Sequence, residues 1–231
     1  MKLVILSDIH ANPVALRCVL EAEPDADAVY CAGDLVDCGP EPYEAVEMCR
    51  CLGICAVKGN HDAIVLREPG GRLSVPYNAA EYARAVLGEV NLKYLDSLPD
   101  SLFWKSDGVG YCMTHRYSLD YSERIATAEE FDEYWRTACP DSCSSGRRRL
   151  IFGHTHEQYI ISLPGGREVI NPGSVSYQRG NERVAAEYAI IENGNIRMMR
   201  REYPTGELLK RACELELDPG LEWIRDMFRK K

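Results

Sequence analysis

The sequence lacks a hydrophobic run long enough to cross a membrane, which takes about 18 or more consecutive apolar residues. Its opening apolar stretch, Leu3–Leu6, is too short for a signal peptide and is followed at once by Ser7 and Asp8. We therefore expect this stretch to form the first β-strand of a cytoplasmic protein, and we expect no association with a membrane.

An excess of basic residues is also absent. Lys and Arg number 27 against 36 Asp and Glu, which gives a net charge of -9. General binding to nucleic-acid backbones needs a positive surface, so this balance argues against that function. It leaves open a small substrate that carries phosphate. Histidine is scarce, with 5 among 231 residues, and the positions of these few residues carry most of the functional interpretation.

The ten cysteines lack the paired spacing of a zinc finger. Cys49, Cys51 and Cys55 form one cluster, and Cys139 and Cys143 form another, but neither cluster has a matching second half. A chain of this length can bury a sizeable core without crosslinks. We therefore expect buried free thiols rather than disulfides.

The first half of the chain alternates short β-branched segments with longer amphipathic ones, which is typical of an α/β fold with parallel strands. Asn12 followed by Pro13 is a helix start signal. The pattern predicts strands at 2–7, 27–32 and 54–57, and helices at 13–22 and 42–52.

The second half predicts strands that pair in an antiparallel manner, at 109–114, 150–152, 157–163, 167–170, 184–192 and 195–202, and helices at 127–138, 205–216 and 219–230. Residues 63–108 are less regular, and we expect a partly helical insertion over the active site, with helices at about 79–87 and 92–98. No repeat or linker divides the chain, so 1–231 is predicted to be a single domain.

All five histidines follow predicted strands, and each lies next to or near Asp, Asn, Gly or Thr: His10, His61, His115, His154 and His156. Ligands bind at this carboxyl edge in open α/β sheets. A spacing of two places Asp8 with His10, and His154 with His156, on one side of an extended segment. Carboxylate, amide and imidazole ligands together suit a pair of borderline divalent ions.

Five motifs in order carry a resemblance to a known family: Asp8-Ile9-His10, Gly33-Asp34-Leu35-Val36-Asp37, Gly59-Asn60-His61-Asp62, His115 and Gly153-His154-Thr155-His156. Over about residues 1–175 the chain resembles the calcineurin-like metallophosphoesterases. It is most similar to their small bacterial and archaeal branch, which includes phosphodiesterases and dinucleoside-polyphosphate hydrolases. The resemblance implies an α/β fold, a four-layer αββα sandwich of two mixed β-sheets flanked by helices, with a dinuclear metal site at the carboxyl edge of the strands.

The resemblance also implies a role for each site residue. Asp8, His10 and His156 would hold one metal, Asn60, His115 and His154 would hold the other, and Asp34 would bridge them. His61 would be the general acid, and Asp62 would orient or polarise it. The cofactors would be two divalent metal ions, with manganese favoured over iron, nickel, cobalt and zinc. A metal-bridging hydroxide would attack a phosphodiester or small nucleotide in line.

Two further residues are candidates for substrate binding. Asn12 matches a family position near the metals, although its capping role explains it equally well. Arg116 stands where the family often has glycine, and its guanidinium is predicted either to clamp phosphate oxygens or to be solvated. Arg147–Arg149 is predicted to lie in solvent at the start of a strand rather than to contact a polyphosphate.

Several functions remain as alternatives. A diadenosine polyphosphate hydrolase is compatible with the same motifs. A serine/threonine phosphoprotein phosphatase fits less well, because Cys38 replaces the Arg that grips phosphate in those enzymes. A non-catalytic protein-binding member, similar to a retromer-type trafficking subunit, is disfavoured because every ligand position and His61 are intact. The sequence leaves the substrate, the native metals and homo-oligomer formation open.

Overall fold

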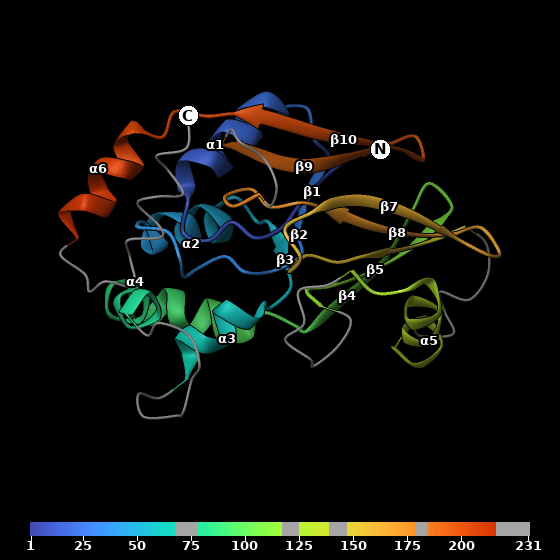
Figure 1. Ribbon diagram of the computed structural model, residues 1–231, viewed down its shortest axis with the longest axis horizontal. Helices are drawn as coiled ribbons and strands as arrows, with labels where there is room; N and C mark the ends of the chain where they lie inside the picture. The colour runs from blue at the N-terminus through green and yellow to red at the C-terminus, as the bar shows by residue number, and fades with distance from the viewer. Residues whose placement is uncertain (68–77, 117–124, 139–146, 179–183, 216–231) are drawn as a thin grey trace.

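The computed structural model describes residues 1–67, 78–116, 125–138, 147–178 and 184–215. Figure 1 shows two β-sheets stacked as neighbouring layers, with helices outside them. The two mixed sheets have five strands each, in the orders β10-β9-β1-β2-β3 and β4-β5-β6-β8-β7. This confirms the predicted α/β fold with two mixed sheets.

The first sheet is parallel at its centre, as predicted from the alternation of strands and helices. β1 (Lys2–Leu6) pairs in parallel with β2 (Ala28–Cys31), which pairs in parallel with β3 (Cys55–Ala56). On the other side of β1, β9 (Ala185–Glu192) and β10 (Asn195–Glu202) are antiparallel. The ends of β1, β2 and β3 therefore lie along one edge of the sheet.

The antiparallel pairing expected of the later strands is confirmed for two hairpins, 157–163 with 167–170 and 184–192 with 195–202. The centre of the second sheet is instead parallel. β5 (Val109–Thr114), β6 (Arg148–Ile151) and β8 (Arg167–Pro172) run parallel to one another. Only the outer strands β4 (Ser101–Ser106) and β7 (Gln158–Leu163) are antiparallel to their neighbours. The carboxyl ends of β5 and β6 consequently reach the same edge of this sheet.

Strand β4 is an element that the sequence interpretation missed within 63–108. It joins β5 through Asp107-Gly108, whose φ angles of 49° and 74° are both in the left-handed region. Asp-Gly is a favoured two-residue hairpin turn because Gly accepts this conformation readily. The signal for a hairpin was therefore present in the sequence.

Three apolar clusters separate the layers. In β1, alternate side chains face opposite sides, so Leu3 and Ile5 pack between the two sheets while Val4 and Leu6 pack beneath the helices. The helices on that side include α1 (Pro13–Ala22), α2 (Pro42–Cys51) and α6 (Gly206–Glu214), and the two helices within residues 60–97 contribute to the same cluster. On the second sheet, α5 (Ala128–Ala138) buries Phe131 against Phe152.

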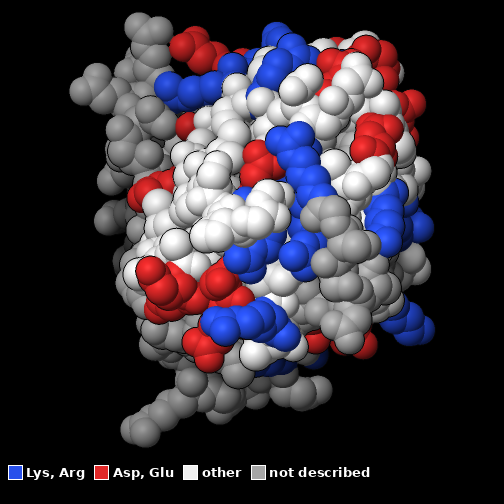
Figure 2. Space-filling view, turned by 90° about the vertical axis from the view of Figure 1, so that its right-hand side faces the viewer, with Lys and Arg blue, Asp and Glu red and all other residues white. Residues whose placement is uncertain are grey.

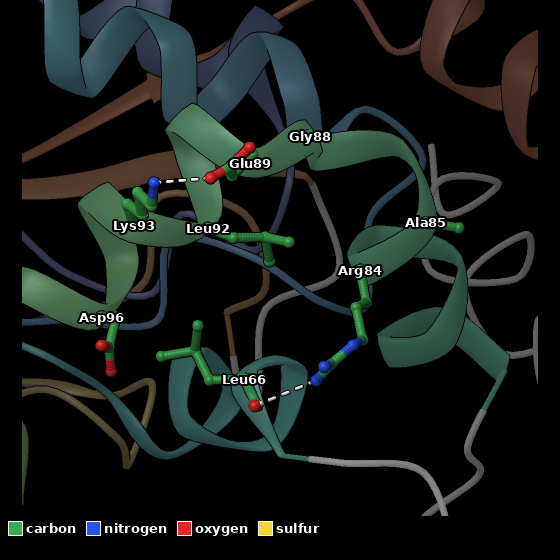
Figure 3. Close-up of a pocket in the computed structure, with 8 residues that line it drawn as sticks. All are labelled: Leu66, Arg84, Ala85, Gly88, Glu89, Leu92, Lys93 and Asp96. Carbon is green, nitrogen blue, oxygen red and sulfur yellow. Dashed lines mark hydrogen bonds and ion pairs between the residues drawn. The ribbon is translucent and has the colours of Figure 1, made fainter.

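The remaining described helices, α3 (Asn60–Leu66) and α4 (Asn78–Ser97), come from the segment predicted as an insertion. α4 is kinked at Gly88, where φ is 69° and ψ is 166°. Figure 3 shows the hollow that these helices enclose, about 450 Å³ in volume, with Arg84 pointing toward Leu66. The predicted position of this segment over the active site, and the single domain, stay predictions. The helix predicted at 219–230 lies outside the described residues.

The charged surface is mixed. Figure 2 shows basic and acidic side chains interspersed over one face rather than gathered by sign. Arg147 and Arg149 both pair with Glu168, at 3.1 and 2.8 Å. Arg149 is fully buried, so the expectation that it lies in solvent is wrong for this residue. None of the helices in the described ranges is both long and apolar enough to span a bilayer.

The cysteines in the described ranges are free thiols, but not all are buried as expected. Cys51, Cys55 and Cys213 are exposed. Exposed thiols matter for the design of metal-binding experiments, because they bind soft ions without forming a built site. Cys139 and Cys143 lie outside the described residues.

Arg84 offers a test of how α3 is held. Its Nη1 donates to the carbonyl oxygens of Val65, Leu66 and Arg67, at 3.3, 3.0 and 2.6 Å. Loss of this charged donor in Arg84→Ala should lower the free energy of unfolding by about 1–3 kcal/mol. Lys93→Ala is the control, because Lys93 is exposed and pairs with exposed Glu89. Thermal unfolding that shifts equally in the two variants would contradict the capping role.

Candidate metal centre

The predicted metal ligands follow the carboxyl ends of five strands, which come from both sheets, and they lie close together in space. Asp8 and His10 follow β1, Asp34 follows β2, and Asn60 begins α3 just after β3. His115 follows β5 directly, and the loop after β6 carries His154 and His156. The structure brings all seven predicted ligand residues into two neighbouring groups.

The first group consists of Asp8, His10 and His156. His156 Nε2 lies 3.2 Å from Asp8 Oδ1 and 3.1 Å from His10 Nε2. His10 Nε2 is 3.9 Å from Asp8 Oδ1. Both Asp8 and His10 are almost completely buried. Two imidazole nitrogens and a carboxylate oxygen thus converge on a small buried volume.

The second group consists of Asp34, His115 and His154, joined by Asn60. His115 Nε2 lies 3.1 Å from Asp34 Oδ2 and 2.9 Å from Asn60 Oδ1. Its Nδ1 is 2.8 Å from the carbonyl oxygen of Ala32, which accepts a hydrogen bond from it and fixes the orientation of the ring. Asp34 Oδ2 is also 3.9 Å from His10 Nε2, so this carboxylate lies between the two groups.

His61 lies beside both groups without joining either one. Its Nε2 is 4.0 Å from Asp34 Oδ2, and its ring meets that of His10 edge to face at 4.9 Å. Its Nδ1–H donates to Asp37 Oδ2 at 2.7 Å. The side chain is 20% exposed, against 1% for Asp34, so solvent reaches this ring.

The model of the calcineurin-like phosphoesterase superfamily domain matches residues 1–195. The chain belongs to this superfamily. It is 29% identical to the uncharacterized protein MJ0912 of Methanocaldococcus jannaschii over an alignment 246 residues long, gaps included. The alignment covers 96% of this chain and 95% of that protein. The family predicted from the five motifs is thereby confirmed.

Solved structures of other proteins share the fold. A metallophosphoesterase from Sphaerobacter thermophilus is 27% identical with a TM-score of 0.75, covering 99% of this chain and 100% of that one. The hypothetical protein PH1004 from Pyrococcus horikoshii OT3 is 18% identical with a TM-score of 0.81, covering 100% of this chain and 99% of that one. The similarity therefore extends over the whole length of each chain.

Asp37, not Asp62, is hydrogen-bonded to the ring of His61 in this superfamily member. The expectation that Asp62 orients or polarises His61 came from the family resemblance. The carboxylate of Asp62 instead accepts hydrogen bonds from the backbone N–H groups of Gly59, Asp34, Leu35 and Val36, at 2.8 to 3.3 Å. Asp37 belongs to the Gly33–Asp37 motif, so the sequence marks it as a site residue. The sequence does not show that it contacts His61.

The backbone of the centre is unusual. Eight residues other than glycine in the loops at the centre have positive φ angles: Asp8, His10, Ala11, Asp34, Asp37, Cys38, His154 and His156. Each residue held in this region costs about 1–3 kcal/mol, which the surrounding structure must offset. Such strain turns successive side chains toward the same point and is common at functional sites.

Burial and charge set the protonation of the site. Burial lowers the pKa of His10 and of His154 to about 4, so both rings are neutral at pH 7. Burial alone would also lower the pKa of His115, but the charge of Asp34 and their hydrogen bond raise it to about 9. For His61, burial is likewise outweighed by the charge of Asp34 and the hydrogen bond with Asp37, so its pKa is well above the usual range.

These residues fit a pair of divalent metal ions. His154 Nε2 is buried and has no hydrogen-bond partner among the residues described. The Nε2 atoms of His10 and His156 face each other at 3.1 Å, a contact that a shared cation would satisfy. Imidazole nitrogens mixed with carboxylate and amide oxygens are the donor set of borderline ions such as manganese, iron and zinc.

The two predicted substrate contacts differ in their surroundings. Asn12 is fully buried. Its Oδ1 accepts from the N–H of Ala15, and its Nδ2 donates to Ser176 and Tyr203, so it caps α1 and we propose no substrate contact for it.

Arg116 lines a hollow of about 380 Å³ that opens beside the second group. The hollow is lined by Lys58, Gly59, Asn60, Ala63, Asp100, Ser101, Thr114, His115, Arg116 and Tyr134. Asn60 and His115 belong both to this hollow and to the second group. A molecule bound in the hollow would therefore lie next to these two candidate metal ligands.

The raised pKa of His115 predicts that metal binding releases a proton. At pH 7.5 this ring is protonated, because its pKa is about 9. A ring that binds metal must be neutral. Metal affinity should therefore increase as the pH rises toward about 9. Calorimetric titration of Mn²⁺ in buffers of different ionisation enthalpy measures the released protons.

His61→Asn is the control for this experiment, since it removes the other histidine whose pKa is raised. At least one proton per chain should still be released by this variant. Metal binding without proton release at pH 7.5 would contradict the protonated state of His115.

Proposed function

We propose that this protein is a dinuclear metal-dependent phosphoesterase that hydrolyses phosphodiester or small nucleotide substrates. The observation that supports this most strongly is the position of Asp34 Oδ2, 3.1 Å from His115 Nε2 and 3.9 Å from His10 Nε2. One carboxylate thus reaches both ligand groups. The similarity to the Sphaerobacter thermophilus metallophosphoesterase supports the same reaction class.

Each group would hold one ion. Asp8, His10 and His156 would bind the first, Asn60, His115 and His154 the second, and Asp34 would bridge them. Two divalent ions in such a site activate water at neutral pH, orient the phosphoryl group and offset the charge that develops on its oxygens. Manganese is the ion that we propose first, because carboxylate and amide oxygens accompany the imidazoles.

His61 would supply the proton that the reaction needs. When a P–O ester bond breaks and water oxygen bonds to phosphorus, the departing oxygen gains an electron pair and must be protonated. The raised pKa of His61 keeps its ring protonated at neutral pH. With Nδ1–H held by Asp37 at 2.7 Å, Nε2–H remains to serve as the donor.

Arg116 would hold the rest of the substrate. Its side chain lines the hollow that also contains the metal ligands Asn60 and His115. A guanidinium binds phosphate oxygens through two parallel hydrogen bonds. We propose the phosphate contact for Arg116 because of its place in this hollow, next to Asn60 and His115.

The proposal is tested by removing and restoring the metals. Metal-stripped protein reloaded with Mn²⁺, Ni²⁺, Co²⁺ or Zn²⁺ should bind two ions per chain and recover hydrolysis. A panel of bis-nitrophenyl phosphate, a cyclic nucleotide and diadenosine tetraphosphate separates diesterase from dinucleotide hydrolase activity. Asp34→Asn, which removes the charge of the shared carboxylate, should lose binding of at least one ion. Binding of fewer than two ions by the wild-type chain would overturn the proposal.

Two variants separate proton donation from substrate binding. His61→Ala should lower kcat by about 10²–10⁴-fold for esters with poor leaving groups, and far less for nitrophenyl esters, which leave without a proton. Arg116→Ala should raise KM for both kinds of substrate alike. Equal losses of kcat on both substrates in His61→Ala would rule out the acid role. Steady-state kinetics of the two variants under saturating Mn²⁺ provides the measurement.

A further inference from the structure

Cys38 places a thiol directly beside the proposed proton donor. Its Sγ lies 3.9 Å from His61 Nδ1, and only 8% of the residue is exposed. The loop that carries it has a left-handed backbone, with φ of 68° at Asp37 and 66° at Cys38. The N–H of Cys38 donates to Asp37 Oδ1 at 2.8 Å. The thiol is therefore held in position by the same loop that orients the His61 ring.

This loop also packs tightly against the segment that carries His10. A Cβ atom on Gly39 would lie 2.1 Å from the carbonyl oxygen of His10, so the two backbones touch at a residue without a side chain. One ligand atom from each of His10, Cys38 and His61 lies within 4.8 Å of the other two. The three side chains form a third candidate metal-ligand group, distinct in composition from the two described above.

The donor set of this third group is chemically different. A thiolate with two imidazoles is a ligand combination of zinc, with Zn–S near 2.3 Å and Zn–N near 2.0–2.1 Å. In tetrahedral geometry these bond lengths place sulfur and nitrogen on the order of 3.5 Å apart, close to the observed 3.9 Å. Thiolates favour zinc, cadmium and copper(I), whereas manganese and magnesium favour oxygen ligands.

His10 belongs to this group and also to the first metal group. Its Nε2 is 3.1 Å from His156 Nε2, and its ring is 4.9 Å from that of His61. An ion bound at His61 Nδ1, the nitrogen 3.9 Å from Cys38 Sγ, would displace the hydrogen bond to Asp37 and leave Nε2–H on a neutral ring, which gives up its proton far less readily than an imidazolium does. Bound also to His10 Nε2, the ion would remove a ligand from the first group.

We propose that His10, Cys38 and His61 form an inhibitory site for a thiophilic divalent ion, for which zinc is the representative. The ion competes with the activating metal for His10 and makes His61 a poorer proton donor. Inhibition rests on the proposed phosphoesterase function, whereas binding of the ion does not. Manganese binds thiolate weakly, so in its presence Cys38 keeps its proton and the site holds no ion.

Cobalt(II) reports binding directly, because cobalt bound to thiolate shows a charge-transfer absorption in the near ultraviolet. Co²⁺ added to the full chain should produce this absorption, and Cys38→Ser and Cys38→Ala should each lose it. A triple variant, Cys51→Ser, Cys55→Ser and Cys213→Ser, is the control for the exposed thiols of the described residues and should keep it. Circular dichroism verifies that each variant is folded. Absorption that persists in both folded Cys38 variants, or that never forms in the wild type, would overturn the site.

Zinc titration of the Mn²⁺-activated protein tests the inhibition. Each variant is compared with its own rate without zinc. The wild type should be inhibited, and raising Mn²⁺ should relieve the inhibition because the ions compete for His10. Loss of one of three protein ligands in Cys38→Ser should raise the zinc concentration for half inhibition about tenfold or more. Equal zinc sensitivity of wild type and Cys38→Ser would refute the inhibitory role. If the protein hydrolyses no phosphoester, the cobalt absorption still decides whether the site exists.

Discussion

The centre depends on one buried carboxylate, that of Asp62, which is not itself a proposed metal ligand. Asp62 accepts hydrogen bonds from the backbone N–H of Gly59, next to β3, and from three consecutive N–H groups after β2, beginning at Asp34. Burial and the charge of Asp34 raise the pKa of Asp62 to about 6, while these N–H groups oppose the rise. The four hydrogen bonds offset the cost of burying the charge. They also fix how far Asp34 lies from Asn60 and His61.

The left-handed residues explain why local rules of sequence fail at this edge while they succeed elsewhere. β1 and α1 form where alternation and the Asn12 cap predict them, because apolar burial and capping agree there. At Asp8, His10 and Asp34 the backbone adopts a conformation that these residues disfavour in isolation. Hydrogen bonds between separate loops, from the N–H of Asp8 to the carbonyl oxygen of Gly33 and from the N–H of His10 to that of Asp34, hold them in it, and no local pattern encodes these contacts.

The positions of the histidines were predictable because strand ends are visible in a sequence, and parallel strands bring their ends together. The partner of His61 was not, because the family resemblance implied Asp62, whereas contacts between separate loops bring Asp37 to the ring. The parallel pairing of β5, β6 and β8 was likewise missed, since pairing across a sheet depends on contacts distant in sequence. β4 was missed for a different reason, because its Asp107-Gly108 turn is a local signal that went unused.

Protons and metal ions are alternative ways to balance the same buried charges. Hydrogen bonding and charge from His156 overcome the effect of burial and hold the pKa of Asp8 at about 2, so Asp8 is ionised in the folded protein. Without metal, protonated His115 stabilises Asp34. Its pKa rises from 6.5 to about 9 on folding, so this stabilisation is complete below pH 6.5 and is lost as the pH rises through 9. Metal ions supply positive charge in place of that proton, so they bind more strongly as the pH rises toward 9. The net charge of -9 says little about what binds at the centre, because nearby charges dominate over those beyond about 8 Å.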